Sequence, residues 1–469
     1  MPSAWFGLNT AVSALTAAQT ALDTAAHNTA NASTPGYSRQ RVQLVASAPF
    51  TYPAFNKSGL PGQIGTGVSV ASIERARDSF LDVQIRGQNE LSGYWDVRRD
   101  ELAKVETVFP EPSDSGLGSV LSKFWSAWQD VAADPSSTAA RAALTAQAGT
   151  LAQRVNSDAA QLKTLADGTN AQLTGGVNEI NDIAHQLAAL NDQIQRVVVS
   201  GDHANDLADQ RDALLDRLST LVPLTVEPQA DGSTTVLVAG TDLVNHGTAR
   251  VITAGTNGAG NVEPQWSDGS AVSLGGARLG ALVEVRDITL AGYRTQLNAL
   301  VKGIADAVNM VHQTGTDATG TPGLAFFTST AGAEASSLAV NPAIAADPRL
   351  VAAASAANQP GDGSIAGGIA DLRNALLFGS GTQTAADTYA GLVSGIGSDS
   401  RQGVEMADNQ AHVVDHLTTR RASISGVSLD EEATDMIKFQ HAYQAAARVI
   451  TAVDEMLDQL INRTGLVGR

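Results

Sequence analysis

The strongest constraint on the fold lies at the C-terminal end of the chain, where the predicted helix over residues 428–462 carries two apolar stripes. The first stripe, at heptad spacing, consists of Phe439, Ala442, Ala446, Val449, Val453, Met456 and Leu460. The adjacent stripe consists of Met436, Tyr443, Ala447, Ile450, Leu457 and Ile461. A helix that packs on one partner needs a single stripe, so the doubled stripe indicates more than one partner. Ser428 and Glu431 form a capping-box pattern at the start of this helix.

The N-terminal end carries a heptad stripe of its own. Its members are Leu8, Ala11, Leu15, Ala18, Leu22 and Ala25. This helix must end near residues 31–36, because Thr34 precedes a proline and Gly36 tolerates positive φ. Both ends therefore expose more apolar surface than a small domain needs. We expect the two terminal helices to pair with each other and then with other copies of the chain.

The middle of the chain reads as helices interrupted by one β module. Helices are predicted over residues 74–108, 115–133, 136–166, 171–199, 204–221, 279–312, 364–378 and 384–424. Residues 37–73 suggest short extended segments, and residues 223–276 suggest a small β module with a turn at Asp231-Gly232. The expected fold class is mainly α, with paired N- and C-terminal coiled-coil helices, an elongated helical-bundle domain and a small inserted β domain. The expected domains are a terminal axial domain with an extended segment (1–73 and 425–469), a helical-bundle domain (74–222 and 279–424) and a small β domain (223–278).

Charge and composition exclude several function classes. A net charge of -18 without any Lys/Arg run excludes nucleic acid as a partner, since such a surface repels phosphate. The absence of cysteine excludes disulfides, thiolate zinc sites and cysteine nucleophiles. No window reaches about 18 consecutive apolar residues, so we expect no transmembrane helix and no membrane partner. Residues 1–7 lack a signal-peptide pattern, which indicates a cytoplasmic protein or export by a route that does not read such a signal.

No catalytic or metal-binding pattern rises above background. His412 and His416 lie four apart on a predicted helix, but the glutamate that a zincin needs after the first histidine is absent, so a solvated helix face is favoured. Residues 361–368 lack the Lys-Ser/Thr ending of a phosphate loop. The acidic cluster at 202–209 lacks the ligand spacing of an EF-hand and is typical of a helix N-terminus. Carboxylates for glycoside cleavage need only meet in space, and no pattern singles out a pair. The sequence predicts no catalytic residue, no metal and no cofactor.

Both ends of the chain resemble a known family. The N-terminal motif comprises Ser13-Ala14-Leu15, Gln19, Ala21-Leu22, Asn28, Ala30-Asn31 and Thr34-Pro35-Gly36-Tyr37-Ser38-Arg39-Gln40. A second segment is similar to the one that follows this motif in the family. It comprises Gly67–Val70, Ile73, Arg75, Asp78, Phe80-Leu81 and Gln84. The C-terminal motif comprises Gly426–Glu432, Met436-Ile437, Phe439-Gln440 and Ala442–Ile450. They resemble the two signatures of the flagellar axial proteins of rod, hook and hook-associated type, in the right order.

The middle is similar to the hook-associated members more than to rod or hook proteins. The segments that carry this similarity are Ser38-Arg39-Gln40, Asn205-Asp206-Leu207, Asp209–Asp212, Leu214-Leu215, Val340-Asn341-Pro342, Ile344, Asp347-Pro348 and Tyr389–Val393. They touch most of the chain except the β module.

The resemblance implies a structural, non-enzymatic subunit at the junction of hook and filament. It implies an extracellular location in the flagellum, reached through the flagellar type III channel without a cleaved signal peptide. The implied partners are a ring of like subunits, the hook protein, the next hook-associated protein toward the filament, and a cytoplasmic export chaperone on the C-terminal helix. The implied assembly motif comprises Leu15, Leu22, Asn28, Asn31, Thr34, Pro35, Gly36, Tyr37, Phe439, Tyr443, Ala446, Val449, Ile450, Val453, Leu457 and Leu460.

Three alternatives remain open at the level of sequence. One is a hook or distal-rod protein of the same family, although we expect those to be richer in β structure in the middle. Another is a flagellum-associated hydrolase built on axial ends, against which the missing His-Glu-x-x-His pattern weighs. The last is a cytoplasmic helical adaptor, which requires the terminal motifs to be accidental.

Overall fold

The computed structural model describes residues 4–49 and 65–463, and its contacts group the chain into two compact units. Unit 1 comprises Met1–Asn89, Glu179–Val251 and His412–Arg469, and unit 2 comprises Glu90–Asn178 and Ile252–Ala411. Three long helices, α2 (Ser79–Val108), α4 (Thr138–Val199) and α11 (Ala385–Ser425), contribute residues to both units. This grouping differs from the predicted division into three domains, which stays a prediction.

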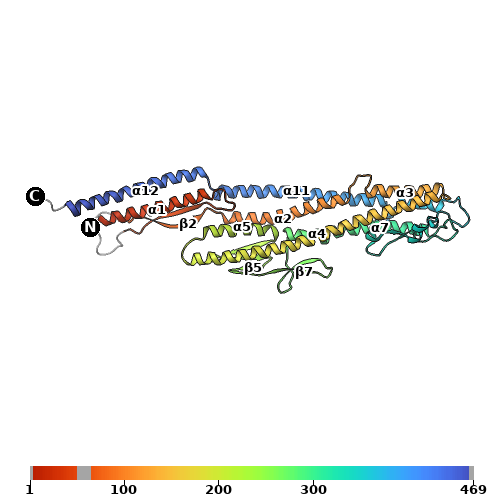
Figure 1. Ribbon diagram of the computed structural model, residues 1–469, viewed down its shortest axis with the longest axis horizontal. Coiled ribbons are helices and arrows are strands. Elements are labelled where there is room, and N and C mark those ends of the chain that lie inside the picture. Colours follow the sequence, from red (N-terminus) through yellow and green to blue (C-terminus); the bar gives the residue numbers. More distant parts are fainter. Residues whose placement is uncertain (1–3, 50–64, 464–469) are drawn as a thin grey trace. The chain divides into compact units, whose positions relative to one another are not determined.

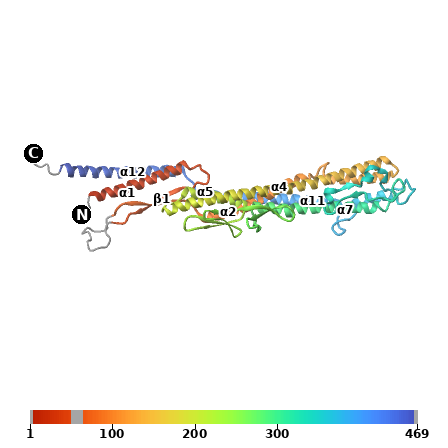
Figure 2. The ribbon, with the colours of Figure 1, turned by 60° about the horizontal axis from the view of Figure 1, so that its bottom comes forward.

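In unit 1 the two terminal helices, α1 (Ala4–Ala30) and α12 (Leu429–Asp458), lie side by side and run antiparallel (Figures 1 and 2). Over residues 6–30 of α1, the buried apolar side chains are alanines, at positions 11, 17, 18, 21 and 25. On α12, Ala446 and Val453 are the buried apolar side chains. Small side chains allow two helix axes to approach closely. The predicted pairing of the chain ends is confirmed within a single chain.

A β-hairpin packs beside α1. Strands β1 (Gln40–Ala46) and β2 (Val68–Arg75) are antiparallel, with a register shift between Gln43 and Leu44. They account for the predicted extended segments at either side of residues 50–64, which lie outside the described residues.

The rest of unit 1 combines helix α5 (Asn205–Leu221), the end of α4 and a four-stranded antiparallel sheet. The strands, in spatial order, are β3 (Leu224–Pro228), β4 (Thr234–Val238), β5 (Thr241–Asn245) and β6 (Thr248–Ala249). Gly232 has a φ of 82° in the turn between β3 and β4, as the Asp-Gly pattern predicts. The Asn191 amide of α4 holds the sheet, donating to the carbonyl oxygens of Thr234 (2.8 Å) and His246 (2.9 Å).

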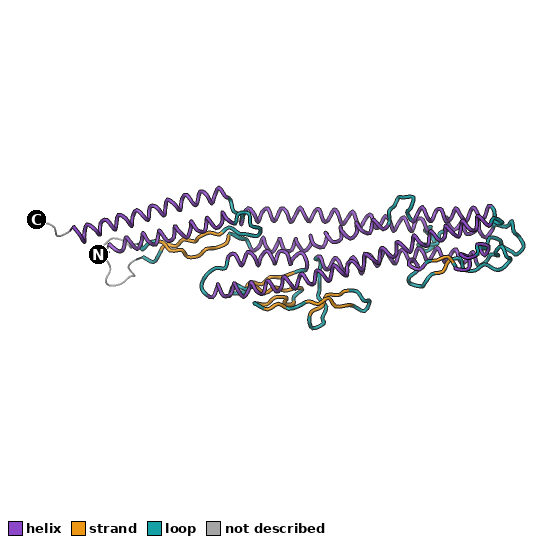
Figure 3. The backbone as a smooth tube through the Cα atoms, in the orientation of Figure 1, coloured by secondary structure: helices purple, strands orange, loops and turns teal. Residues whose placement is uncertain are grey.

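Unit 2 has a large apolar core with an aromatic centre. Its helices are parts of α2, α4 and α11 together with α3 (Leu117–Ala133), α6 (Arg278–Glu284), a π-helical turn (Val285–Leu290), α7 (Ala291–His312), α8 (Glu334–Ser337), α9 (Pro342–Ala346) and α10 (Ser364–Asp371). Two short hairpins join them, β7 (Ile252–Thr256) with β8 (Val262–Trp266) and β9 (Phe327–Thr328) with β10 (Ala339–Val340) (Figure 3). Five core side chains form the aromatic centre: Phe124, Trp125, Trp128, Phe326 and Phe327.

Several expectations need correction. The helix predicted from residue 74 begins at Ser79, because Glu74 and Arg75 pair with β1, and the helix predicted over 364–378 ends at Asp371. The predicted helices 136–166 and 171–199 are one continuous helix, α4. The segment between them is helical because Thr169 is fully buried and its hydroxyl donates to the Ala166 carbonyl, while the Asn170 side chain accepts from the Val262 amide at 3.0 Å. The strands expected in one module fall into two sheets, β3–β6 in unit 1 and β7–β8 in unit 2. The prediction of a mainly α chain with small antiparallel sheets is confirmed.

Candidate assembly site

Asn28, in the last turns of α1, joins three segments of unit 1. Its side-chain nitrogen donates to the Gln40 carbonyl (2.9 Å) and to Glu432 Oε2 (3.1 Å). Its side-chain oxygen accepts from the Gln40 amide (2.9 Å) and the Tyr37 hydroxyl (2.8 Å). The end of α1, the start of β1 and the first turn of α12 therefore meet at one buried amide that is fully hydrogen-bonded.

Arg39 fastens the first turn of α12 to the same place. Its Nε lies 2.5 Å from Glu432 Oε1, its Nη1 pairs with Glu431, and its Nη2 lies 3.6 Å from Asp435. Its backbone amide donates to the Ser425 carbonyl at 2.8 Å, at the end of α11. Carboxylates in the first turn of a helix also suit the positive end of the helix dipole. Arg39 thus ties β1 to both sides of the connection between α11 and α12.

Helix α5 presents two carboxylates to the start of β1 and the end of β2. The Asp209 carboxylate accepts from the Ser38 amide (2.8 Å) and hydroxyl (2.7 Å). Arg75 Nη1 lies 2.8 Å from both Asp209 Oδ1 and Asp212 Oδ2. Burial works against the charged form of Asp212, but Arg77, Arg75 and Arg86 outweigh it and hold the pKa of this carboxyl below its usual value.

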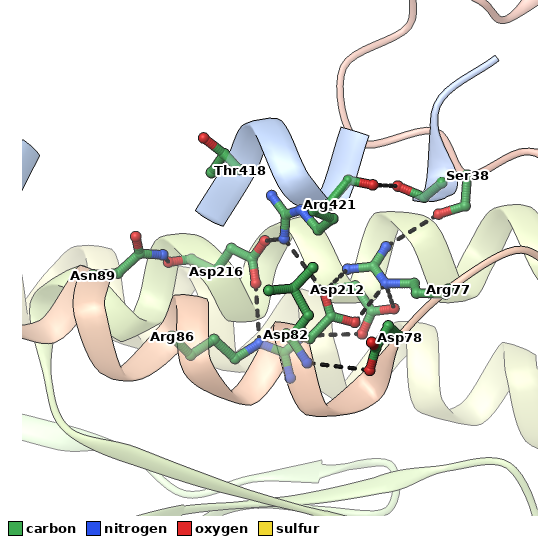
Figure 4. Close-up of polar contacts among 12 residues, drawn as sticks. Ser38, Arg77, Asp78, Asp82, Arg86, Asn89, Asp212, Asp216, Thr418 and Arg421 are labelled. Atoms are coloured by element: carbon green, nitrogen blue, oxygen red, sulfur yellow. Dashed lines mark hydrogen bonds and ion pairs between the residues drawn. The ribbon is translucent and has the colours of Figure 1, made fainter. Parts of the chain in front are cut away.

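The same network reaches the start of α2 and the end of α11 (Figure 4). Arg77 Nε lies 2.7 Å from Asp82 Oδ2, and Arg86 Nε lies 3.0 Å from Asp216 Oδ1. Arg421 of α11 lies between these two acids, 2.5 Å from Asp216 Oδ2 and 3.5 Å from Asp82 Oδ1. We call this set the charge network: Arg39, Arg75, Arg77, Arg86, Arg421, Asp82, Asp209, Asp212, Asp216, Glu431, Glu432 and Asp435.

The chemistry of the charge network is ion pairing between five arginines and seven carboxylates. Every guanidinium in it has carboxylate partners, and such buried ion pairs fix geometry. The described residues contain no group of three side chains that could hold a metal ion. Within residues 4–49 and 65–463, no helix is long and apolar enough to cross a membrane. The arrangement connects α1, α5, α11, α12 and the β1–β2 hairpin where these elements meet, which indicates a structural role.

The predicted turn after α1 lines an open cavity in unit 1. Gly36 has a φ of 81° there, as the motif predicts. The cavity, of about 770 Å³, lies between residues 31–37 and helices α4 and α5. Its walls carry the amides of Asn31, Gln186, Gln193 and Gln210. The predicted residues Thr34 and Pro35 also line it and are exposed.

The two apolar stripes of α12 divide differently from the prediction. Phe439, Ala446 and Val453 of the first stripe, with Ile450 and Leu457 of the second, are buried or half-buried beside α1, and Tyr443 is 36% exposed. Val449, Met456 and Leu460 are 48%, 55% and 56% exposed. On α1, Leu15 and Leu22 are half-buried. One apolar face of α12 thus covers α1, and a neighbouring face is open in the single chain.

Sequence reasoning missed most of the charge network. Asp209 was read as part of an acidic helix start, and Arg77, Arg86, Asp216 and Arg421 were not singled out. The spacing of Asp209, Asp212 and Asp216 along one face of α5 is a signal that could have suggested a basic partner surface. His412 and His416 are exposed on α11. The loop before α10 is held by Asp362, which accepts from the Ser364 amide at 2.9 Å.

Comparisons with known proteins agree along the whole chain. Residues 102–327 match the family model of the flagellar hook-associated protein FlgK helical domain. Residues 8–37 match the model of the flagella basal body rod protein, and residues 420–463 match the model of the flagellar basal body rod FlgEFG protein C-terminal region. Flagellar hook-associated protein 1 of Bacillus subtilis is 34% identical over 100% of both chains. The proteins of that name from Salmonella typhimurium and Escherichia coli are each 28% identical, covering 97% of this chain and 99% of theirs.

A solved structure shares the fold. The flagellar hook junction protein FlgK from Burkholderia pseudomallei superposes with a TM-score of 0.64 at 17% identity, covering 73% of this chain and 100% of its own. The segments Ser38–Gln40 and Asn205–Asp212, which suggested the hook-associated members, are joined here by contacts of Ser38 with Asp209 and of Gln40 with Asp206. With a full-length relative at 34% identity, the chain belongs to the family of flagellar hook-associated protein 1, FlgK.

Proposed function

We propose that this chain is a structural subunit of the bacterial flagellum at the junction of hook and filament, and that it assembles through α1 and α12. The observation that carries the proposal is the open apolar face of α12, with Val449, Met456 and Leu460 each about half exposed. Such a face on an otherwise paired helix is suited to burial against further helices. The family membership supplies the flagellar setting.

The charge network supports this role because it sets the position of α12. A helix that must fit between neighbours needs a defined starting direction. Arg39 of the network, together with Asn28, contacts the first turn of α12, and Arg421 holds the end of α11 that precedes it. Each arginine of the network is paired with at least one carboxylate, which favours a structural subunit over an enzyme.

The partners in this proposal are further copies of the chain in a ring, the hook protein and the next hook-associated protein toward the filament. Before assembly, an export chaperone covers the C-terminal helix, because its open apolar face invites premature association. The subunit reaches the flagellum through the type III channel without a cleaved signal peptide. The turn at Asn31, Thr34, Pro35, Gly36 and Tyr37 serves as a seat for the neighbouring subunit.

Deletion of residues 428–469 tests the proposal, with the full-length chain restored to the same cells as the control. Hooks without filaments, together with unpolymerised flagellin in the medium, are the expected result. An export assay on the truncated chain separates failed assembly from failed secretion. Normal filaments and motility would refute the junction role.

A further inference from the structure

We propose that the buried contact among Asn28, Arg39 and Glu432 fixes the register in which α1 pairs with α12. We call these three residues the register lock. The inference concerns the helix pair within one chain, so it goes beyond the junction role and does not depend on it.

The apolar contacts of α1 specify pairing but leave its register open. The buried Ala11, Ala18 and Ala25 repeat every seventh residue, and so do the half-buried Leu8, Leu15 and Leu22. A slide by one heptad, about 10 Å along the axis, therefore places alanine where alanine was and leucine where leucine was. The exceptions are the buried Ala17, which a slide would replace by Thr10 or Thr24, and Ala21, which it would replace by Ala14 or Asn28. Sliding therefore keeps the apolar burial of the heptad positions of α1 and changes it at two others.

The contacts of the register lock form in only one register of the helix pair. Asn28 and Glu432 are each 2% exposed, and the lock joins them at 3.1 Å while Glu432 Oε1 lies 2.5 Å from Arg39 Nε. A slide by one heptad removes Glu432 from both partners. A buried carboxylate and a buried guanidinium would then lack compensation, and buried charges without partners are strongly disfavoured. A polar contact inside an apolar helix interface is a known way to select one register.

A competing explanation lies in the chain connection. Only residues 426–428 separate α11 from α12, and the Ser425 carbonyl accepts from the Arg39 amide at 2.8 Å. This tether alone could hold the register. The two explanations differ when the side chains of the lock are made apolar, because the backbone tether then stays intact.

The test measures the distance between α1 and α12 in the full-length chain. The chain has no cysteine, so spin labels can be placed at Gln19→Cys and Gln444→Cys alone, both on exposed positions. Pulsed electron paramagnetic resonance should give one narrow distance in this parent. Arg39→Met/Glu432→Leu should keep the helices paired, since apolar residues of similar volume can replace a buried ion pair. We expect a second distance in that variant, from a population displaced by about 10 Å along the axis.

Glu431→Leu is the matched control. It makes the same chemical change one residue away, at a carboxylate that also pairs with Arg39 but has a side chain 63% exposed. The control should keep the single parent distance.

Two results would overturn the inference. A single parent distance in Arg39→Met/Glu432→Leu would assign the register to the tether, and a broad distribution in the parent would mean that the lock does not hold the helices. If the double variant loses helix content by circular dichroism, Asn28→Leu/Glu432→Gln decides, since it removes both the charge of Glu432 and the amide that donates to it. A second distance in this variant supports the lock, and the parent distance alone refutes it.

Discussion

Several charged residues of unit 1 form ion pairs with residues far away in the sequence. Arg75 and Arg77 precede α2, Asp209 and Asp212 lie in α5, and Arg421 closes α11. Removing one member of a buried ion pair leaves the other charge buried without a partner. The resulting loss of stability therefore exceeds the net stabilisation that the pair provides. Surface pairs lack this penalty because water solvates whichever charge remains.

Asp212→Asn is therefore expected to destabilise the chain by about 3 kcal/mol, measured by urea unfolding at pH 7. Because the folded-state pKa of Asp212 is lowered, its contribution is present above the unfolded value of about 3.9 and is lost as the pH falls below it. The control is Asp192→Asn, which breaks a surface pair with Arg196 and should cost no more than about 0.5 kcal/mol. Equal effects of the two changes would contradict the buried role of Asp212.

In unit 2 both ring nitrogens of the buried His312 contact the backbone. It is fully buried, with Nδ1 2.6 Å from the Leu324 carbonyl and Nε2 accepting from the Ala352 amide at 2.8 Å. This pattern requires the neutral ring with the proton on Nδ1. Burial lowers the pKa of His312 to about 4.

The lowered pKa predicts a loss of stability in acid. His312 contributes fully above its unfolded pKa of about 6.5, and the contribution fades as the pH falls from there toward 4, by up to about 3 kcal/mol. His312→Gln, which keeps a donor and an acceptor but cannot titrate, should flatten unfolding free energy against pH over this window. His441→Gln, at an exposed site on α12, should leave the slope as it is. An unchanged slope in His312→Gln would show that other groups govern the acid response.

At the scale of elements, periodic sequence patterns predicted which helices and hairpins form. Contacts between residues far apart in the sequence could not be predicted from such patterns. The heptad stripes gave the pairing of α1 with α12, and the Asp231-Gly232 turn gave the hairpin of β3 and β4. The division of the α12 stripes could not be read from the sequence, because both stripes are apolar and the contacts that orient α12 come from residues distant in the chain, among them Arg39 and Asn28. Helix α4 was split wrongly at residues 167–170, since tertiary burial of Thr169 overrides weak local propensity.

Two adjacent glycines in α4 should respond differently to the same change. A Cβ at Gly175 meets nothing within 4 Å, whereas one at Gly176 would lie 2.7 Å from Leu279 Cδ1. Gly175→Ala should stabilise the chain by about 0.5–1 kcal/mol, the ordinary preference of a helix for alanine. Gly176→Ala should gain less or destabilise, because Leu279 must move. Thermal unfolding by circular dichroism compares them, and equal gains would show that Leu279 adapts without cost.

Over the whole molecule, the two units are stabilised by different means. Unit 2 has an apolar core around five aromatic side chains, while unit 1 combines buried aliphatic side chains, such as Leu187, Leu215 and Val236, with the charge network. The terminal helices of unit 1 bury mainly alanine and leave larger apolar side chains of α12 open. This distribution suits a subunit whose ends complete their burial only with neighbours.

The open face of α12 gives a prediction that separates folding from assembly. Val449→Ser/Met456→Ser should change the unfolding free energy of the isolated chain by no more than about 1 kcal/mol, because both side chains are about half exposed. In cells, the same variant should produce hooks with few or no filaments, since the face would no longer bury apolar area against neighbours. Thermal unfolding and electron microscopy of cells measure the two effects.

The control for this variant lies in unit 2, where Ile288→Ser/Met310→Ser changes two side chains that are 68% and 70% exposed. This control removes two apolar side chains that are more exposed than Val449 and Met456, and it should leave filaments normal. If both variants lose filaments, the effect is general and not specific to α12. If Val449→Ser/Met456→Ser keeps normal filaments, the open face is not an assembly surface. A stability loss well above 1 kcal/mol in that variant would instead place the two side chains inside the fold of the single chain.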